Sequence, residues 1–325
     1  AEKTFKAEKS DGTINLEFYI KRGDLAGKTV VVFEKLYHDE KEVAVHTDIE
    51  DEAQTVTYPK VGTKASETTG STDKEVIIKD IVSYENLVPG KEYTVTGTLM
   101  DKATGKAFKA GDKEVTGKAT FIASESGSGT VEVAFQFDRS YLTEETVLVV
   151  FEKLFNVEGK LAGLHEDLED EDQTVRQPQV STKAKDKETG TNEGFADEEV
   201  TVVDEVNYKN LIVGKEYTVK GVLMDKETNK PFITRDGNEV HAEKTFTAMK
   251  RDGTIELEFK ITKVDLGGKS VVVFETLYQE DKEVAAHTDI EDNDQSVHYP
   301  KVGTQAAEIS QESDEDVVIK DIVFY

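Results

Sequence analysis

Apolar and polar residues alternate with a period of two along several stretches of the chain. The segments 14–20, 131–137 and 255–261 each place Ile, Leu, Val or Phe at every second position. Successive side chains of a β-strand point to opposite faces, so this alternation predicts half-buried strands. Turn signals such as Pro89-Gly90 separate the runs, and no helical period of useful length is present. The sequence therefore predicts an all-β fold.

The strand pattern lies within a longer repeat. The segment His46–Val56 returns at His165–Val175 and again at His287–Val297, at spacings of 119 and 122 residues. Each copy keeps a His, an Asp two positions later, a second Asp five positions later and a Gln eight positions later. A Pro follows each copy at the same spacing, so the whole unit repeats and not the motif alone.

If each unit begins just after its Pro, the chain contains two complete units and two partial ones. Residues 1–60 form the C-terminal half of a repeat, 61–178 and 179–300 are complete domains, and 301–325 is the N-terminal fragment of a further repeat. Seven or eight short strands in about 120 residues predict antiparallel, immunoglobulin-like β-sandwiches. The junctions contain no Gly/Ser-rich linker, which predicts a semi-rigid, rod-like tandem array.

Composition narrows the classes of function. The formal net charge of -27 argues against a binder of nucleic acid or of anionic membranes, because both need a Lys/Arg-rich surface. No apolar run reaches the roughly 18 residues that a membrane-spanning helix needs, and the first residues do not resemble a signal peptide. The absence of Cys excludes disulfides, a thiolate nucleophile and a thiolate metal site.

One Glu in each unit is predicted to face the core. Within the strand-like run 149–154, Glu152 shares its face with Val150 and Leu154. The equivalent positions hold Glu34 and Glu275. Because removing a carboxylate from water costs several kcal/mol, such a Glu is expected to be paired or protonated.

A Thr near the start of each unit also shares the apolar face. These residues are Thr63, Thr182 and Thr304. The first and last strands of a sandwich often lie side by side, so the opening Thr and the closing Gln of one unit could meet. Asp170 has the opposite parity to His165 and Gln173, so a turn or bulge is expected to bring these three side chains together.

These motifs resemble the ester-bond-forming immunoglobulin-like domains, called VaFE or T-Q ester repeats, of Gram-positive surface adhesins. The family's opening Thr-x-Ala-x-Asp is matched at 182–186, and Glu replaces the Asp at 67 and 308. Its Phe-Glu motif is matched at 33–34, 151–152 and 274–275. Its closing His-x-Asp-x-x-Asp-x-x-Gln-(Thr/Ser)-Val occurs three times, so the resemblance covers the whole chain.

The resemblance implies a self-catalysed ester between the Thr hydroxyl and the Gln side-chain carbonyl, with loss of ammonia. The implied cross-links are Thr63–Gln173 and Thr182–Gln295. A Thr hydroxyl needs a base, and a carboxamide needs a donor for its developing charge. We expect His165 and His287 as bases. A neutral acid would come from two carboxyl pairs that each share one proton, Glu152 with Asp170 and Glu275 with Asp292.

The partial units are expected to stay unlinked within this chain. The first holds Glu34, His46, Asp51 and Gln54 without an opening Thr, and Thr304 has no Gln after it. No role follows for the first Asp of each motif, at positions 48, 167 and 289. Each domain would react once, so the protein is not predicted to be a turnover enzyme, and no cofactor or metal is expected.

The resemblance implies a stalk segment of an extracellular, cell-wall-anchored adhesin. Its partners would be neighbouring repeats, with a host ligand bound by a tip domain outside this chain; the signal and anchor would also lie outside it. The alternative is a ligand- or metal-binding module that uses the acidic loops without a cross-link, although their spacing lacks the Gly of an EF-hand. Lys–Asn isopeptide chemistry is a further rival, but the paired positions hold Thr and Gln.

Overall fold

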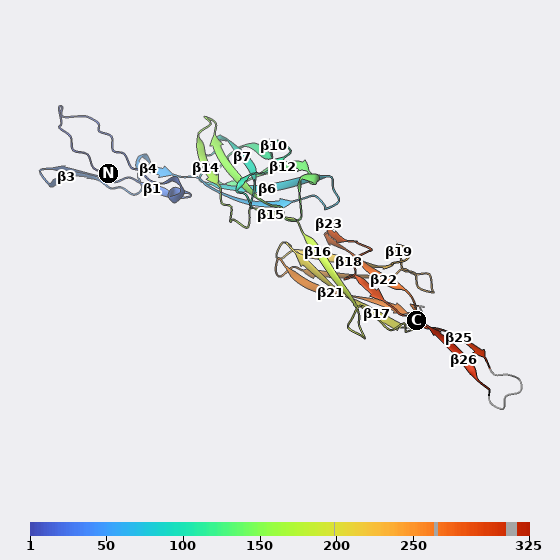
Figure 1. The fold of residues 1–325 in the computed structure, drawn as a ribbon. Coiled ribbons are helices and arrows are strands. Elements are labelled where there is room, and N and C mark those ends of the chain that lie inside the picture. The colour runs from blue at the N-terminus through green and yellow to red at the C-terminus, as the bar shows by residue number, and fades with distance from the viewer. Residues whose placement is uncertain (198, 263–265, 310–316) are drawn as a thin grey trace. The chain divides into compact units, whose positions relative to one another are not determined.

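The computed structural model describes the backbone of residues 1–197, 199–262, 266–309 and 317–325. Its regular structure is almost entirely β-strand, as Figure 1 shows, which confirms the predicted all-β class. In the described residues the only helical segments are three single 3-10 turns: η1 (Arg22–Leu25), η2 (Glu52–Gln54) and η3 (Arg139–Tyr141). The chain divides into two compact units. The first comprises residues 1–68, 75–141 and 147–175, and the second comprises 69–74, 142–146 and 176–325.

The first unit contains a sandwich of two antiparallel sheets. One sheet has the order β12-β6-β5, and the other has the order β11-β7-β13-β14, with β15 added on β13 and β8 on β7. The strands are β5 (Lys60–Glu67), β6 (Glu75–Glu85), β7 (Glu92–Asp101), β8 (Lys106–Ala107), β11 (Thr116–Ile122), β12 (Gly129–Asp138), β13 (Val147–Asn156), β14 (Leu161–His165) and β15 (Thr174–Arg176). A small hairpin joins β9 (Lys109–Ala110) to β10 (Lys113–Glu114).

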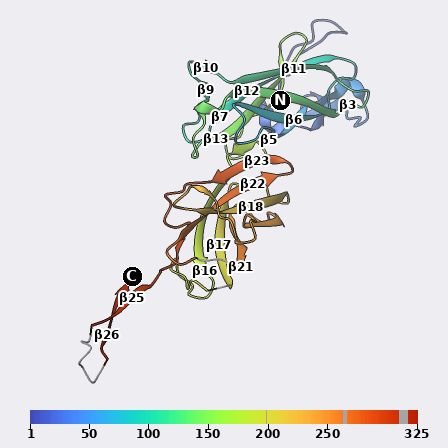
Figure 2. The ribbon, with the colours of Figure 1, turned by 90° about the vertical axis from the view of Figure 1, so that its right-hand side faces the viewer.

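The second unit repeats this strand order. Its sheets are β16-β17-β21 and β19-β18-β22-β23, with β20 on β18 and β24 on β22. Figure 2 shows β16, β17 and β21 side by side, with β18, β22 and β23 above them. The strands are β16 (Gln179–Asp186), β17 (Glu199–Lys209), β18 (Glu216–Asp225), β19 (Lys230–Pro231), β20 (His241–Thr247), β21 (Gly253–Thr262), β22 (Ser270–Gln279), β23 (Lys282–His287) and β24 (Ser296–His298).

The core lies between the two sheets of each sandwich and is filled by every second residue of the strands. In β6 the side chains of Val76, Ile78, Val82 and Tyr84 are buried, whereas their neighbours face outward. The predicted strands 131–137 and 255–261 are confirmed as β12 and β21, in which the apolar residues face the core and the residues between them face solvent. The cores are therefore built by the period-two pattern.

The predicted strand at 14–20 is wrong: this segment has no regular structure. Phe18 and Ile20 are 50% and 53% exposed. The corresponding strands β12 and β21 are paired along their whole length with β6 and β17. Residues 1–13 contain no such partner strand. An alternating sequence alone does not satisfy the backbone N–H and C=O groups of a strand, because a neighbouring strand must supply the hydrogen bonds.

The remaining strands of the partial units form hairpins and short ladders. In the first, β1 (Thr29–Val31) pairs with β4 (Thr55–Thr57), and β2 (Glu34–His38) pairs with β3 (Lys41–His46). In the last, β25 (Gly303–Glu308) pairs with β26 (Ile319–Phe324). The ladder between β2 and β3 has the register of the β13–β14 and β22–β23 ladders in the complete domains.

Candidate functional site

The sheet register places the inward Glu of each unit beside a His. Glu152 on β13 lies directly opposite His165 on β14, and Glu275 lies opposite His287 in the same way. On the other side of β13, the residue opposite Glu152 is Gly97. A Cβ at Gly97 would approach the Phe135 ring to 2.4 Å. The ring therefore occupies the space that a side chain beside the Glu would fill, and it excludes water from that side.

Two backbone hydrogen bonds hold the closing loop between the first strand and the Glu strand. In 61–178, the Ala65 N–H donates to the Asp172 carbonyl at 2.8 Å, and the Val150 N–H donates to the Gln173 carbonyl at 3.0 Å. The second complete domain has the same pair of bonds, from Ala184 to Asp294 at 2.8 Å and from Val273 to Gln295 at 3.1 Å. Because Thr63 and Thr182 lie two residues before these alanines, the opening Thr and the closing Gln share one site.

The Thr and the Gln are in direct contact in the second complete domain. Gln295 Nε2 lies 2.9 Å from Thr182 Oγ1 and 2.8 Å from Glu275 Oε2. Gln295 and Glu275 are 0% exposed and Thr182 is 6% exposed. The site is therefore closed to bulk water, which strengthens every electrostatic interaction within it.

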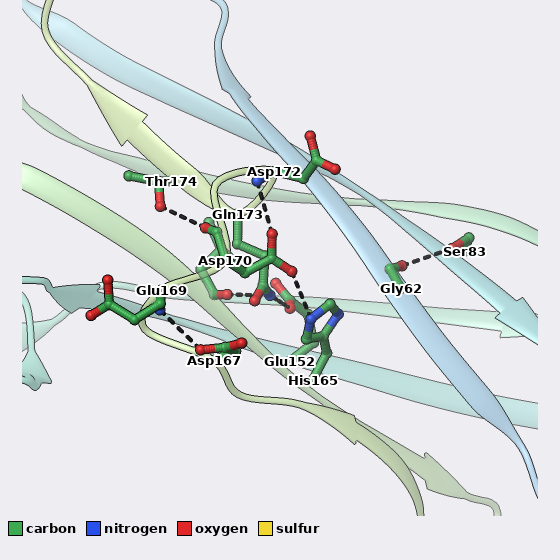
Figure 3. Close-up of polar contacts among 11 residues, drawn as sticks. Gly62, Ser83, Glu152, His165, Asp167, Glu169, Asp170, Asp172, Gln173 and Thr174 are labelled. Atoms are coloured by element: carbon green, nitrogen blue, oxygen red, sulfur yellow. Dashed lines mark hydrogen bonds and ion pairs between the residues drawn. The ribbon is translucent and has the colours of Figure 1, made fainter. Parts of the chain in front are cut away.

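In the first complete domain the Gln amide is held slightly differently. Gln173 Nε2 donates to the Val150 carbonyl at 2.5 Å and contacts Glu152 Oε2 at 2.7 Å, as Figure 3 shows for the Glu152 contact. A backbone carbonyl can only accept a hydrogen bond, so the Gln173 side-chain atom that faces the Val150 carbonyl is the amide nitrogen and not the amide oxygen. Thr63 Oγ1 is buried and forms no hydrogen bond of normal geometry with any described residue. The Gln oxygens of both sites are likewise unpaired among these residues.

A second buried carboxyl, which was not predicted from the sequence, belongs to each site. Asp80 on β6 and Asp204 on β17 are both 0% exposed, and each pairs in register with the Ala that follows the opening Thr by two residues. The alternation of the sequence already indicates these two inward positions. In 76–84 and 200–208, the Asp occupies an inward position among Val, Ile and Tyr, so the parity argument applied to Glu152 would have found both.

The predicted carboxyl pairs need correction. Asp170 does not join Glu152; its Oδ2 lies 2.9 Å from His165 Nε2, and its Oδ1 accepts the Asp172 N–H at 2.8 Å. Asp292 does the same with His287, at 3.2 Å. Figure 3 shows the loop turning Asp170 toward the His ring. The carboxyl that acts on Glu152 is Asp80, and the one that acts on Glu275 is Asp204.

Burial and a neighbouring Asp raise the pKa of the inward Glu of each site. Burial, together with the neighbouring Asp80, raises the pKa of Glu152 to about 10, and burial raises the pKa of Asp80 itself. In the second domain, burial raises the pKa of Asp204 to about 6. Burial and Asp204 together raise the pKa of Glu275 well above its usual value. At pH 7 Glu152 is therefore neutral and can donate a proton, and Asp204 is ionised and can accept one.

The raised pKa of Glu152 predicts a pH-dependent stability of the uncross-linked domain. Glu152 is neutral in the folded state and ionised in the unfolded state between pH 4.5 and about 10, so folding takes up a proton there and stability falls as pH rises. In a Thr63→Ala background, Glu152→Gln should raise the free energy of unfolding by about 3 kcal/mol at pH 7. It should also remove most of the decline with pH.

Hydrogen exchange of β13 peptides at pH 5, 7 and 9 measures this effect. The exposed residue Glu145 provides the control, because Glu145→Gln should leave the pH dependence unchanged. A Thr63→Ala/Glu152→Gln variant that keeps the full pH dependence would contradict the assignment of a neutral Glu152.

The structure also brings together the partial site of residues 1–60. Gln54 Nε2 contacts Glu34 Oε2 at 2.5 Å, and His46 Nε2 lies 3.0 Å from Asp51 Oδ2. Glu34 and Gln54 are half-buried, because no opening strand covers them. Thr304 lies exposed on the β25–β26 hairpin and has no closing Gln after it in the sequence.

A comparison with protein families identifies the family to which the repeated unit belongs. The family described as "T-Q ester bond containing domain" matches residues 1–58, 59–177 and 178–299. The chain belongs to this family. The T-Q ester bond match thus covers the half-repeat as well as both complete domains, and it confirms the resemblance inferred from the motifs. A comparison with curated protein sequences gives no match.

Solved structures resemble the T-Q ester bond chain only distantly. An adhesin from Mobiluncus mulieris containing intramolecular disulfide, isopeptide and ester bond cross-links is 14% identical, covers 82% of this chain and 93% of its own, and gives a TM-score of 0.32. A β-glucuronidase of glycoside hydrolase family 2 is 8% identical, covers 73% of this chain and 25% of its own, and gives a TM-score of 0.27.

Among the described residues, no helix is long and apolar enough to cross a membrane.

Proposed function

We propose that this chain is a stalk segment of a Gram-positive surface adhesin, in which each complete domain is locked by one self-formed Thr–Gln ester. The observation that carries the proposal is the 2.9 Å contact between Thr182 Oγ1 and Gln295 Nε2, beside the buried Glu275. Membership of the T-Q ester bond family supports it. We assign the cross-links Thr182–Gln295 and Thr63–Gln173.

The ester forms by attack of the Thr182 hydroxyl oxygen on the side-chain carbonyl carbon of Gln295. The new C–O bond replaces the C–N bond, and ammonia leaves. The hydroxyl proton passes to ionised Asp204. Burial raises the pKa of Asp204 to about 6, while hydrogen bonds with Glu275 and Thr182 and the charge of His287 lower it. His287 thus favours the ionised base rather than serving as the base itself.

The amide nitrogen must be protonated before it can leave, because an amide anion is a very poor leaving group. Glu275 Oε2 accepts an N–H of the Gln295 amide at 2.8 Å. Once the hydroxyl has attacked the carbonyl carbon, neutral Glu275 donates its proton to that nitrogen. Asp204 then returns the Thr proton to Glu275, so the carboxyl pair ends as it began. In the other domain, Asp80, Glu152 and Thr63 take the same roles. The pathway consumes its own side chains, so each domain reacts once and is not a turnover enzyme.

The mechanical role follows from where the bond lies. Thr182 is on the first strand of its domain and Gln295 directly precedes the last strand, β24. A pulling force that enters at the first strand and leaves by the last would pass through the ester, so the core between them carries little load. The bond serves in place of disulfides, since the chain has no Cys. We further propose an extracellular, cell-wall-anchored rod whose host ligand is bound outside this segment.

Intact mass tests the proposal directly. The purified chain should be lighter than its sequence by two molecules of ammonia, and peptide mapping should link the Thr63 and Thr182 peptides to those of Gln173 and Gln295. Thr63→Ala should lose one link and keep the other. Strong base should cleave both links, because an ester is hydrolysed under these conditions. An isopeptide link would survive them. An unshifted mass would contradict the proposed function.

A further inference from the structure

The first Asp of each closing loop has a consistent structural environment in all three repeats. Asp289 Oδ1 accepts the Glu291 N–H at 2.9 Å, and its backbone carbonyl accepts the Asp292 N–H at 3.2 Å. The corresponding distances at Asp167 are 2.9 and 3.3 Å, and at Asp48 they are 3.0 and 3.4 Å. Each Asp therefore closes a turn in which its side chain substitutes for a backbone acceptor.

This turn leads directly into a second one that positions the reacting Gln. Asp292 Oδ1 accepts the Asp294 N–H at 2.8 Å, and the Asp292 carbonyl accepts the Ser296 hydroxyl at 2.6 Å. The other carboxyl oxygen of Asp292 faces His287. The first turn orients the backbone of Asp292, and the second delivers Gln295. Figure 3 shows the equivalent bonds at Asp167, Asp170 and Thr174.

The partial unit shows that the loop forms from local bonds. Residues 48–55 keep both turns, including the Ala53 N–H bond to Asp51 Oδ1 at 2.7 Å and the Thr55 hydroxyl bond to the Asp51 carbonyl at 2.7 Å. Among the residues that the structure describes, no opening strand with its Thr pairs with the strands on either side of this loop. The loop geometry is thus present independently of the Thr that would react with the Gln.

We propose that Asp289 and Asp167 are positioning residues for ester formation, which act through the loop that carries Asp292 or Asp170 and the reacting Gln. This inference rests on the proposed function. Both side chains are exposed, so their charge is solvated and the hydrogen-bond acceptor atom is what matters. An Asn keeps that acceptor at the same place, whereas an Ala removes it.

The test follows each link separately during cell-free synthesis of the full chain, with samples digested and the linked peptides quantified by mass over time. Asp289→Ala should slow the Thr182–Gln295 link on the order of tenfold and leave the Thr63–Gln173 link at its usual rate. Asp167→Ala should do the reverse. Asp289→Asn should restore the parent rate, whereas Asp292→Asn, which loses the charge facing His287, should not. Asp48→Ala should change neither rate.

The outcomes separate this inference from the function on which it rests. If the parent chain never loses ammonia, the proposed function fails and this role falls with it. If the parent links form but Asp289→Ala matches the parent rate, or Asp289→Asn is as slow as Asp289→Ala, only the positioning role is overturned. If Asp289→Ala does not fold, Asp289→Asn still decides: the parent rate supports the acceptor role, and a slow rate overturns it.

Discussion

Thr182→Ala should leave the domain 178–299 without its cross-link and sharply reduce its stability. The ester would close a loop of 113 residues between Thr182 and Gln295. On the chain-entropy model, opening such a loop lowers the free energy of unfolding by about 5 kcal/mol. That is a large part of the total stability of a typical domain. Limited proteolysis on heating should therefore cut 178–299 at a lower temperature while 59–177 stays resistant.

Thr182→Ser is the matched control, because it keeps the hydroxyl nucleophile and removes only a methyl group. It should form the link and retain protease resistance. Loss of resistance confined to 59–177, or a Thr182→Ala chain with two ammonia molecules still lost, would contradict the pairing of Thr182 with Gln295.

Glu275→Gln should prevent the Thr182–Gln295 link while preserving the fold. In the parent chain the Gln295 Nε2 lies 2.8 Å from Glu275 Oε2. The side-chain amide introduced at position 275 has nearly the same shape as the carboxyl, and its oxygen can still accept the Gln295 N–H. An amide has no acidic proton to give to the leaving nitrogen. Loss of a positioned general acid typically slows a reaction by about 10²–10⁴-fold, so we expect the link to be absent from freshly made protein and the Thr63–Gln173 link to be complete.

The exposed Glu256 of β21 supplies the control, since Glu256→Gln makes the same chemical substitution away from the site. Peptide mapping of both variants and of the parent chain gives the answer. Formation of the Thr182–Gln295 link at the parent rate in Glu275→Gln would show that the neutral Glu is not the proton donor.

The two sites share their parts but differ in how tightly the Thr is held. Thr182 is buried and contacts the Gln amide, whereas Thr63 is half-buried and its hydroxyl forms no hydrogen bond of normal geometry with a described residue. The Gln173 amide instead turns to the Val150 carbonyl. The second domain is therefore closer to the reacting arrangement, in which nucleophile and carbonyl carbon must lie side by side.

The sequence by itself determined the strand pattern, the repeat and most members of the site. Alternation gave the inward positions of Glu152 and Glu275, and repetition identified the Thr, His and Gln at fixed spacings. The same alternation places Asp80 and Asp204 inside, so the inward positions of these two residues could also have been predicted from the sequence. These features are local properties of a strand, whose side chains change face at every residue.

Only the tertiary structure decided which inward groups meet. Asp80 and Glu152 come from opposite sheets of the sandwich, and parity says that a side chain points inward but not what it faces across the core. Asp170 was misassigned because the turns of its loop direct its carboxyl to His165. The segment 14–20 was misassigned because a strand exists only beside a partner that satisfies its backbone. The first error concerns the geometry of a loop and the second a missing partner strand, and the period of a sequence encodes neither.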